Sequence, residues 1–317
     1  MGKTNFRDIT SLKVGGSIKH FFEVKNKEDI ISAVVFAKSN SLPIFTIGGG
    51  TDIAVSDDDY NGVVIKYIGN SISYTGNKVT AEAGVIWDKL VEDTVNKNFE
   101  GIESLSGIPG SVGASPIQNI GAYGQELAET LDSLIAYDIE KEKFITFSNK
   151  DCQFGYRESF FKKKENWQKF IIVNVTLKLS SYKGKNLELQ TIRDEILRVR
   201  SEKLENPNEV PNAGSFFKNP IINLELKTKL ITKYPEMVIF DFAEKYKVSA
   251  GWLIEKAGWK GKNLGSVKVS NKHALIITNP NGKGTFKDVK KLADKIIEDV
   301  DKMFGVKLVP EVQYINI

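Results

Sequence analysis

One long stretch of the chain, residues 107–124, fits neither a helix nor a strand. It reads GIPGSVGASPIQNIGAYG, with five glycines, two prolines and no charged residue. Glycine and proline disfavour the interiors of both regular structures, and a long aperiodic segment inside a compact protein is usually functional. Its main-chain donors and acceptors can surround a large flat ligand. The alternative is a structural Ω-loop.

The composition is that of an ordinary soluble globular protein. The 317 residues are 41% hydrophobic and 26% charged with a net charge of +4, and this length predicts two or three domains. The three-lysine run Lys162-Lys163-Lys164 is short enough to be a solvated face, so we expect no nucleic-acid partner. The single Cys152 cannot form an internal disulfide, and no apolar run approaches the ~20 residues that span a bilayer. We therefore expect a cytoplasmic protein without a membrane partner.

Hydrophobic periodicity predicts alternating helices and strands on both sides of residues 107–124. The first helix should turn Ile30, Ile31, Val34, Val35 and Ala37 inward, and the second Trp87, Leu90, Val91 and Val95. A long helix, Thr285 to Phe304, should bury Phe286, Val289, Leu292, Ala293, Ile296, Ile297, Val300 and Met303 and stop at Gly305. The pattern also predicts strands over Pro43–Ile47, Ile171–Leu179 and Ala274–Thr278, and a helix over Leu189–Arg200.

A second glycine-rich segment follows the strand Pro43–Ile47. It reads Gly48-Gly49-Gly50-Thr51-Asp52. Glycine lets main-chain N–H groups approach a phosphate closely. The segment lacks the G-x-G-x-x-G spacing of a dinucleotide-binding loop, and no helical pattern follows it. A plain tight turn is the alternative.

The segment Asn212 to Pro220 reads NAGSFFKNP and places Ser215 among small residues, aromatics and amides. A nucleophilic serine needs an adjacent base, and His20 and His273, the histidines of the chain, lie in no hydrolase motif. If Ser215 is catalytic, its hydroxyl is better suited to hand over a proton than to attack a carbonyl. Otherwise it belongs to a packed turn.

Two further charged residues stand out, each with a structural alternative. Arg157 follows Tyr156 in the motif Phe154-Gly155-Tyr156-Arg157, and it could instead form a surface ion pair with Glu158. Glu311 follows Pro310 near the C-terminus, and it could instead be a carboxylate at a strand edge.

Taken together, these motifs resemble the UDP-N-acetylenolpyruvoylglucosamine reductase family over nearly the whole chain. The most specific parts are residues 115–124, Phe154 to Arg157, and Asn212 to Pro220. The resemblance implies an α+β fold, with an FAD-binding two-lobe fold of the vanillyl-alcohol-oxidase type and a separate C-terminal substrate-binding α+β domain. The expected boundaries are 1–66 and 67–203 for the two FAD-binding lobes and 204–317 for the substrate domain, whose C-terminal strand would carry Glu311 back to the active site.

The resemblance also implies the ligands and the site. FAD would be bound non-covalently, with its pyrophosphate on Gly48, Gly49, Gly50, Thr51 and Asp52 and its flavin held by Pro109, Gly110, Ser115, Ile117 and Gly121. NADPH would reduce the flavin, which would reduce UDP-N-acetylglucosamine enolpyruvate. Ser215 would protonate the resulting enolate, and Arg157 and Glu311 would stabilise it. Tyr156, Lys203 and Asn219 would contact the substrate, with Lys203 and Asn219 near its diphosphate and Lys218 a further polar neighbour of Ser215.

Two departures from the family pattern and two rival functions remain. Asp52 stands where the family commonly has Asn, so a carboxylate would face the pyrophosphate unless it turns toward its own loop. The segment Leu179–Glu188 is short, and Tyr182 is its one tyrosine. Both features argue against a full lid over the UDP. The rivals are another FAD oxidoreductase of the same fold that uses oxygen, and a nucleotide-sugar binder without flavin. We expect no metal, and a monomer or weak oligomer.

Overall fold

The computed structural model describes residues 4–184 and 186–316 and divides the chain into two compact units. Unit 1 comprises Ile18–Gly50 and Asp59–Arg200, with the N-terminal end of the chain. Unit 2 comprises Asn5–Ser17, Thr51–Asp58 and Ser201–Ile317. The three-part division expected from the sequence stays a prediction. Two short segments from the first 60 residues belong to the C-terminal unit here, and not to a first lobe.

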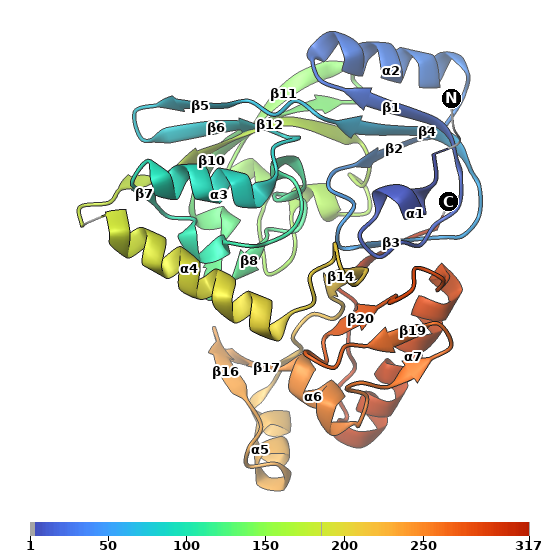
Figure 1. The fold of residues 1–317 in the computed structure, drawn as a ribbon, viewed down its shortest axis with the longest axis vertical. Helices are drawn as coiled ribbons and strands as arrows, with labels where there is room; N and C mark the ends of the chain where they lie inside the picture. Colours follow the sequence, from blue (N-terminus) through green and yellow to red (C-terminus); the bar gives the residue numbers. More distant parts are fainter. Residues whose placement is uncertain (1–3, 185, 317) are drawn as a thin grey trace. The chain divides into compact units, whose positions relative to one another are not determined.

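Unit 1 is built on two sheets (Figure 1). The three-stranded sheet has the order β1-β4-β2 with parallel neighbours, and the five-stranded sheet has the antiparallel order β11-β10-β12-β6-β5. The strands are β1 (Ile18–Val24), β2 (Ile44–Ile47), β4 (Tyr60–Tyr67), β5 (Ile72–Thr75), β6 (Lys78–Glu82), β10 (Leu131–Asp138), β11 (Lys143–Ser148) and β12 (Phe170–Lys178), with the short pairs β7 (Phe99–Glu100) and β13 (Ser180–Ser181), and β8 (Gly121–Ala122) and β9 (Gln125–Glu126). Its helices are α2 (Lys27–Ser39), α3 (Trp87–Asn96) and α4 (Asn186–Lys203), whose last residues enter unit 2.

Helix α2 begins where the sequence predicts but buries a narrower face. Asn26 caps it, since its side chain accepts a hydrogen bond from the Asp29 N–H at 2.8 Å. Ile30, Val34 and Ala37, at positions i, i+4 and i+7, are buried. The prediction that Ile31 and Val35 point inward is wrong, because they are 42% and 51% exposed. They lie beside the buried stripe, on a helix that covers one face of a three-stranded sheet.

Helix α3 and the sheet strands of unit 1 follow the sequence pattern closely. Trp87, Leu90, Val91 and Val95 are all buried, as predicted. The Trp87 indole also donates a hydrogen bond to the Leu105 carbonyl at 3.0 Å, which satisfies its one polar group. The predicted strand Ile171–Leu179 corresponds to β12, and the predicted helix Leu189–Arg200 lies within α4.

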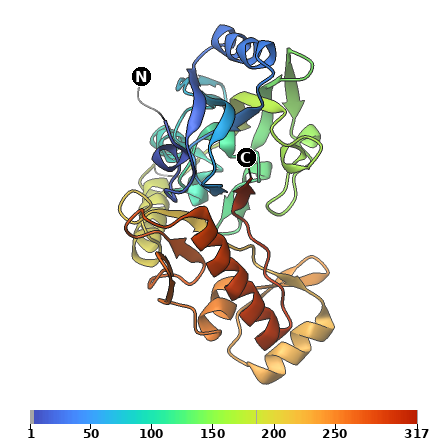
Figure 2. The ribbon, with the colours of Figure 1, turned by 90° about the vertical axis from the view of Figure 1, so that its right-hand side faces the viewer.

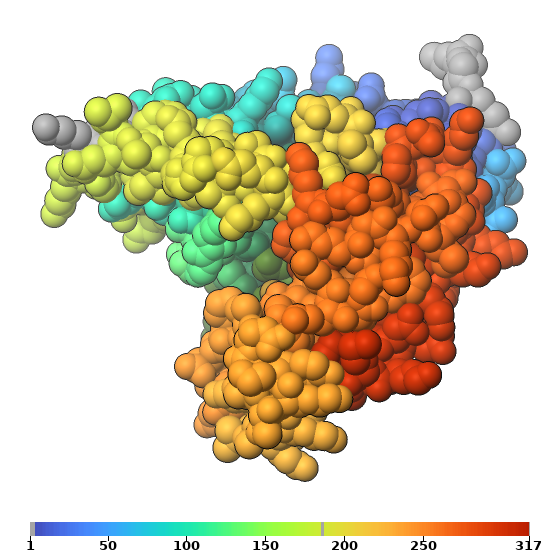
Figure 3. Space-filling view, turned by 60° about the horizontal axis from the view of Figure 1, so that its bottom comes forward, coloured from blue at the N-terminus to red at the C-terminus, as the bar shows by residue number. Residues whose placement is uncertain are grey.

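Unit 2 contains a four-stranded antiparallel sheet, β14-β20-β19-β18, and a three-stranded sheet, β15-β17-β16. Its strands are β3 (Ile53–Val55), β14 (Asn212–Ser215), β15 (Ile221–Ile222), β16 (Ile239–Phe242), β17 (Lys245–Val248), β18 (Asn263–Leu264), β19 (Val267–Val269), β20 (Ile276–Thr278) and β21 (Gln313–Ile315). Its helices are α1 (Phe6–Ile9), α5 (Leu224–Lys233), α6 (Ala250–Lys256) and α7 (Phe286–Phe304), and Figure 2 shows α7 in red along its length. In Figure 3 the gold surface around α5 protrudes from the rest of this unit.

Two segments distant in sequence pair within unit 2. Strand β3 runs parallel to β21, so residues 53–55 lie beside the last strand of the chain. The Gln313 N–H donates to the Asp52 carbonyl at 3.0 Å, and the Ser56 N–H donates to the Ile315 carbonyl at 2.9 Å. The segment that follows the first glycine-rich loop is therefore fixed against the C-terminus.

Helix α7 confirms the strongest helical prediction. Thr285 caps its start by accepting from the Asp288 N–H, and Gly305 ends it in the left-handed region at φ 66°. Val289, Leu292, Ala293, Ile296 and Val300 are buried. Met303, predicted to point inward, is 44% exposed, because Phe304 takes the buried position in the last turn. Among the described residues, we find no helix whose length and hydropathy would suit a membrane span.

Candidate active site

Arg157 lies at the tip of a tight turn in unit 1. The N–H groups of Gly155 and Glu158 each donate to the other residue's carbonyl at 3.1 Å, so Tyr156 and Arg157 are the two central residues. Arg157 adopts φ 56°, in the left-handed region. That conformation costs a residue with a side chain roughly 1–2 kcal/mol, and such costs often accompany functional positions.

The Arg157 guanidinium contacts the end of the segment 107–124 and the residues just after it. Its Nη2 donates to the Gly121 carbonyl at 2.6 Å, and its Nη1 lies 3.8 Å from the Glu126 Oε1. A Cβ on Gly121 would lie 2.9 Å from Nη1 and 2.9 Å from the Gln125 carbonyl oxygen, so glycine leaves room for the guanidinium there. The guanidinium carbon also lies 5.2 Å from the centre of the Tyr156 ring.

Asn119 connects this arginine turn to the glycine-rich segment. Asn119 is 1% exposed, and its amide Nδ2 donates to the Glu126 Oε2 at 2.7 Å and to the Gly155 carbonyl at 3.1 Å. Its Oδ1 accepts from the Ala128 N–H at 2.9 Å. A fully used buried amide stiffens its surroundings, since losing one partner leaves a polar group unsatisfied. Arg157 is therefore held on a framework of side-chain contacts.

The two glycine-rich segments of unit 1 lie against each other. A Cβ on Gly49 would lie 2.8 Å from the Gly110 Cα, and a Cβ on Gly48 would lie 2.7 Å from the Ser111 Oγ. Only glycine permits this approach of two main chains. The Ser111 Oγ is buried without a hydrogen-bond partner among the described residues. A buried hydroxyl without a partner costs roughly 1–3 kcal/mol, so this cradle suits a ligand that carries acceptors, such as the phosphates of FAD.

The other predicted cofactor residues of unit 1 occupy the same segment. Pro109 is exposed at its start, and Ile117 is half-buried and packs against the main core of the unit. Ser115 is 2% exposed, and its hydroxyl donates to the Val112 carbonyl at 2.6 Å. That hydroxyl proton is used within the segment, so a contact from Ser115 to a cofactor would be made by its main chain or by its oxygen as acceptor.

Thr51 and Asp52 belong to unit 2 and continue the first glycine-rich loop. Asp52 adopts φ 58°, which Asn and Asp tolerate better than most residues. The main chain at this position therefore accepts an aspartate. Gly50, the preceding glycine, has φ 66° and is buried.

Unit 2 brings Ser215 and Glu311 together through their main chains. Ser215 ends β14 and is exposed, whereas Phe216 and Phe217 beside it are buried. The Glu311 N–H donates to the Phe216 carbonyl at 2.8 Å, and Phe217 pairs with Pro310. Glu311 itself is half-buried and lies just before β21, not on that strand as predicted.

The predicted substrate residues of unit 2 are placed differently from one another. Lys203 is exposed at the end of α4, as a phosphate-binding lysine requires. The Asn219 Oδ1 accepts from the Ala250 N–H at 2.9 Å, so this amide also fixes the start of α6. The Lys218 N–H donates to the Val309 carbonyl at 2.9 Å, which adds a further main-chain link between the serine segment and the segment before Glu311.

Ser111, Asn119 and Glu126 were not among the residues expected to form the site. The first two lie inside the segment 107–124, where an amide and a hydroxyl amid apolar residues were a visible signal. Glu126 carried no signal in the sequence beyond its place two residues after Gly124, because a glutamate in a turn is normally solvated. Its contact with Arg157 depends on the folding of two distant segments.

Comparison with known proteins gives matches over the whole chain. Residues 18–141 match the model of an FAD binding domain, and residues 206–315 match the model described as UDP-N-acetylenolpyruvoylglucosamine reductase, C-terminal domain. The UDP-N-acetylenolpyruvoylglucosamine reductase of Bdellovibrio bacteriovorus is 38% identical over 97% of this chain and 98% of its own length. The protein of the same name from Pseudomonas aeruginosa is 36% identical over 90% of each chain.

A solved structure agrees with these sequence matches. The crystal structure of UDP-N-acetylenolpyruvylglucosamine reductase from Thermus caldophilus covers 99% of this chain and 98% of its own, with a TM-score of 0.75 and 25% identity. The predicted α+β fold, with an FAD binding domain followed by a separate C-terminal domain, is confirmed. The assignment of particular residues to the cofactor and the substrate stays a prediction.

Proposed function

Because the chain belongs to the UDP-N-acetylenolpyruvoylglucosamine reductase family, we propose that Ser215, Arg157 and Glu311 are its catalytic residues and that NADPH is its reductant. The enzyme is an FAD-dependent oxidoreductase of peptidoglycan precursor synthesis. It converts UDP-N-acetylglucosamine enolpyruvate to UDP-N-acetylmuramate. The carbon–carbon double bond of the enolpyruvyl ether gains a hydride and a proton, and NADPH loses the hydride.

One observation supports the assignment of residues most directly. Within unit 2, the exposed Ser215 is followed by Phe216, whose carbonyl accepts the Glu311 N–H at 2.8 Å. An exposed hydroxyl and a half-buried carboxyl, which sequence analysis named separately, are therefore linked through two adjacent main chains. The hydroxyl of Ser215 is therefore exposed beside a carboxyl, next to two buried phenylalanines.

When bound, FAD would supply the hydride that adds to the double bond, at the vinyl carbon distal to the ether oxygen. The residues that would hold FAD are the glycines of the two facing segments, Gly48, Gly49 and Gly110, together with the Ser111 hydroxyl. Their close main-chain approach excludes side chains from the cradle. None of these residues is a His or a Cys, the residue types that can attach FAD covalently. The set is therefore consistent with non-covalent binding.

Arg157 would bind the carboxylate of the enolpyruvyl group. Hydride addition places negative charge on the carbon between the ether and the carboxylate, and the charge spreads into the carboxylate as an enolate. A guanidinium can pair with both carboxylate oxygens. Arg157 is already fixed by the Gly121 carbonyl and Glu126, so it needs little rearrangement when the charge develops, and this lowers the barrier.

Ser215 would give its hydroxyl proton to the enolate carbon and regain a proton from water. A serine hydroxyl is a weak acid, so it must be held against a strongly basic carbon. Glu311, when protonated, would donate a hydrogen bond to the enolate and share its charge with Arg157. Together the three residues would complete the addition of a hydride and a proton across the double bond.

Lys203, Asn219 and Tyr156 would bind the nucleotide portion and the sugar. The ammonium of Lys203 is exposed at the end of α4 and can act as a point charge on the diphosphate. Such a contact is made equally in the ground state and the transition state, so it should govern KM more than kcat.

An anaerobic experiment tests the proposed function. NADPH should bleach the flavin absorbance of the purified holoenzyme, and the enolpyruvyl UDP-sugar should then restore it without oxygen. Acid precipitation should release all flavin into the supernatant. Reoxidation by oxygen but not by the UDP-sugar would support an oxidase instead, and a colourless protein that binds the UDP-sugar would support a flavin-free binder.

A further inference from the structure

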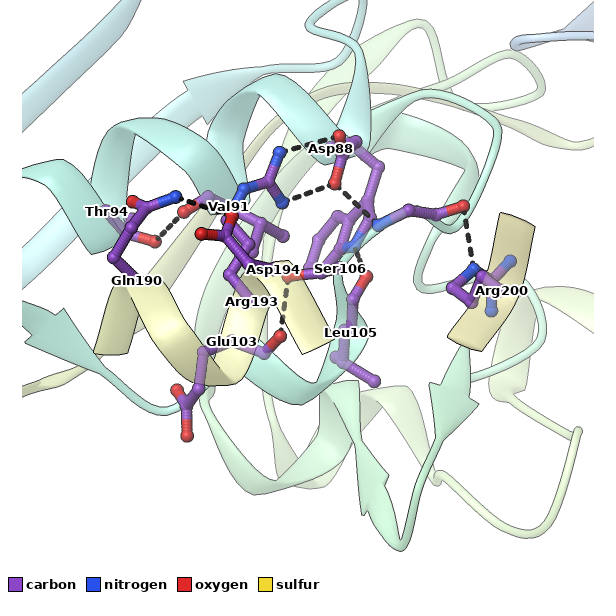
Figure 4. A network of polar contacts seen from close by, with 12 residues as sticks. Asp88, Val91, Thr94, Glu103, Leu105, Ser106, Gln190, Arg193, Asp194 and Arg200 are labelled. Carbon is purple, nitrogen blue, oxygen red and sulfur yellow. Dashed lines mark hydrogen bonds and ion pairs between the residues drawn. The ribbon is translucent and has the colours of Figure 1, made fainter. Parts of the chain in front are cut away.

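Gly107, the first residue of the segment 107–124, is held by three charged side chains from two helices. Its N–H donates to the Asp88 Oδ1 at 2.6 Å, and its carbonyl accepts from the Arg200 Nε at 3.1 Å. The two Asp88 oxygens accept from the Arg193 Nη1 and Nη2 at 2.7 and 2.8 Å. Figure 4 shows the Asp88 carboxylate joined by dashed lines to the Arg193 guanidinium, with Arg200 on a later turn of the same helix.

The side of α4 that contacts Gly107 leaves little room for a side chain at that position. Arg193, Leu197 and Arg200 follow one another at i, i+4 and i+7, so they lie on one side of the helix. Gly107 has φ 71°, and a Cβ there would lie 2.9 Å from the Leu197 Cδ2 and 3.0 Å from the Arg200 Nε. A side chain at this position would require a strained main chain and a shift of Leu197 or Arg200.

The ion pair within this group is buried at the arginine and partly exposed at the aspartate. The Arg193 side chain is 5% exposed and that of Asp88 is 32% exposed. Burial tends to raise the pKa of Asp88, but hydrogen bonds from the Arg193 guanidinium and the Gly107 N–H hold that pKa below its ordinary value. Removing the arginine from water offsets much of the attraction, so such a pair contributes little net stability compared with apolar residues. It does fix the direction of the carboxylate, because the guanidinium binds both oxygens in one plane.

The neighbouring part of the segment is held differently. The Gly110 carbonyl accepts from the Trp87 N–H at 3.0 Å, and the Val112 N–H donates to the Val85 carbonyl at 2.8 Å. These are main-chain contacts that many sequences could make. The position of Gly107 depends on side-chain contacts. Substitutions elsewhere than at a glycine can therefore move the start of the segment.

We propose that Asp88, Arg193 and Arg200 are positioning residues for the flavin, acting through both main-chain groups of Gly107. The proposal rests on the proposed function, in which the segment from Gly107 to Gly124 holds the flavin. The three side chains set where this segment leaves the helices, and therefore how its main-chain donors and acceptors meet the cofactor.

Arg193→Gln tests the proposal in the full-length protein. Glutamine cannot bind both Asp88 oxygens, so the carboxylate loses its fixed direction while the groups at Gly107 are unchanged. The apoprotein should bind FAD at least tenfold more weakly in a fluorescence titration, and the midpoint potential of the bound flavin should shift. Arg193→Lys should recover part of the affinity, because it keeps the charge but not the two parallel hydrogen bonds.

Tyr74→Phe is the matched control. The Tyr74 hydroxyl donates to the Asp93 Oδ2 at 2.5 Å, so its removal also deprives a carboxylate on α3 of a partner, but away from Gly107. It should leave FAD affinity within twofold of the original and the potential unchanged. Equal affinity and potential in Arg193→Gln and Tyr74→Phe would overturn the proposal. If Arg193→Gln does not fold, Asp88→Asn gives the same comparison, since it keeps an acceptor for the Gly107 N–H.

A third variant separates this proposal from the proposed function. Gly49→Ala places a Cβ between the two glycine-rich segments and should abolish FAD binding if the flavin cofactor lies there. Normal FAD binding by Gly49→Ala would contradict the location of the cofactor and both proposals. Weak binding by Gly49→Ala with normal binding and potential in Arg193→Gln would contradict the positioning role alone.

Discussion

The two units hold their proposed catalytic groups in different ways. In unit 1, Arg157 sits on a strained turn, and its guanidinium contacts the Gly121 carbonyl and Glu126, which in turn contacts the buried Asn119. In unit 2, the described contacts hold the main chain on both sides of Ser215: the Glu311 N–H donates to the Phe216 carbonyl at 2.8 Å, and the Gly214 N–H donates to the Oδ1 of the buried Asn212 at 2.8 Å. Substitutions near Arg157 should therefore alter the contacts of the guanidinium itself, whereas substitutions near Ser215 should act through the main chain that carries it.

The difference follows from the local structure. Residues 107–126 have little regular secondary structure. Their main-chain N–H and carbonyl groups therefore need hydrogen bonds from side chains or from other main-chain groups of the segment. Ser215 ends a strand whose neighbour β20 supplies the hydrogen bonds. A strand end holds its residues through the sheet, and it tolerates varied side chains on its exposed face.

The largest effect should come from the close contact of the two glycine segments in unit 1. Gly49→Ala should raise the dissociation constant for FAD by two orders of magnitude or more, because its Cβ would lie 2.8 Å from the Gly110 Cα and main chain would have to move. Fluorescence titration of the apoprotein measures this. Gly76→Ala, where a Cβ meets nothing within 4 Å, is the control and should bind FAD normally.

Gly214→Ala should test the main-chain dependence of unit 2. Gly214 has φ 79° but open space around a Cβ, so the cost is conformational, roughly 1–2 kcal/mol of unfolding free energy. Denaturant unfolding should show that loss, and reoxidation of reduced flavin by the UDP-sugar should slow about tenfold as Ser215 shifts. Gly214→Asn should lose less of both, because Asn tolerates the left-handed region. Equal losses in the two variants would mean that φ is not the cause.

Glu126→Gln should produce a smaller change in unit 1. It removes the charge 3.8 Å from the Arg157 guanidinium while keeping the shape of the side chain. A partly exposed ion pair is worth about 0–1 kcal/mol, so kcat should fall about two- to fivefold with FAD affinity unchanged. Glu140→Gln, which removes an exposed carboxylate paired with Lys169 at 2.8 Å, should leave kcat unaltered. If both variants behave alike, Glu126 does not position Arg157.

The smallest expected effect concerns the acid stability of the Gly107 region. The pKa of Asp88 is below its ordinary value in the folded protein. A carboxylate of this kind adds stability above its unfolded pKa, near pH 4, and that stability is lost as the pH falls through the lower folded pKa. Unfolding free energy measured from pH 5 downward should therefore fall less steeply in Asp88→Asn, by up to one proton or ~1.4 kcal/mol per pH unit. Identical slopes would contradict the pairing of Asp88 with Arg193.

Much of the fold could be predicted from periodicity, but the exact buried faces could not. The helix Thr285 to Phe304 and its stop at Gly305 follow from local sequence, since caps and spacing are local signals. The exposure of Ile31, Val35 and Met303 depends on how much surface each helix covers, which is a tertiary property. Arg193 shows the same limit, because a buried arginine on an otherwise apolar face between Leu189 and Ile196 is understood only with its partner Asp88.

The residues proposed for the site could be chosen from the sequence where they form continuous motifs. Ser215, Arg157 and the two glycine-rich segments stand out because their composition is unusual for a helix or a strand. The contact of Glu126 with Arg157, and the closeness of the Ser111 Oγ to Gly48, could not be predicted, since they join residues far apart in the chain. The left-handed conformation of Asp52 was equally hidden, and it is one that an acid accepts more readily than most residues.

Ser215→Ala, studied in its two half-reactions by rapid-mixing absorbance, tests the central claim most directly. In the proposed mechanism NADPH reduces FAD before the enolpyruvyl group is present, so the variant should be reduced at close to the original rate. Reoxidation by the enolpyruvyl UDP-sugar should slow by ~10² to 10⁴-fold, because the proton donor to carbon is lost, and Ser215→Cys should recover part of this rate. Near-normal reoxidation in a folded Ser215→Ala protein would contradict the account and remove the serine from the mechanism.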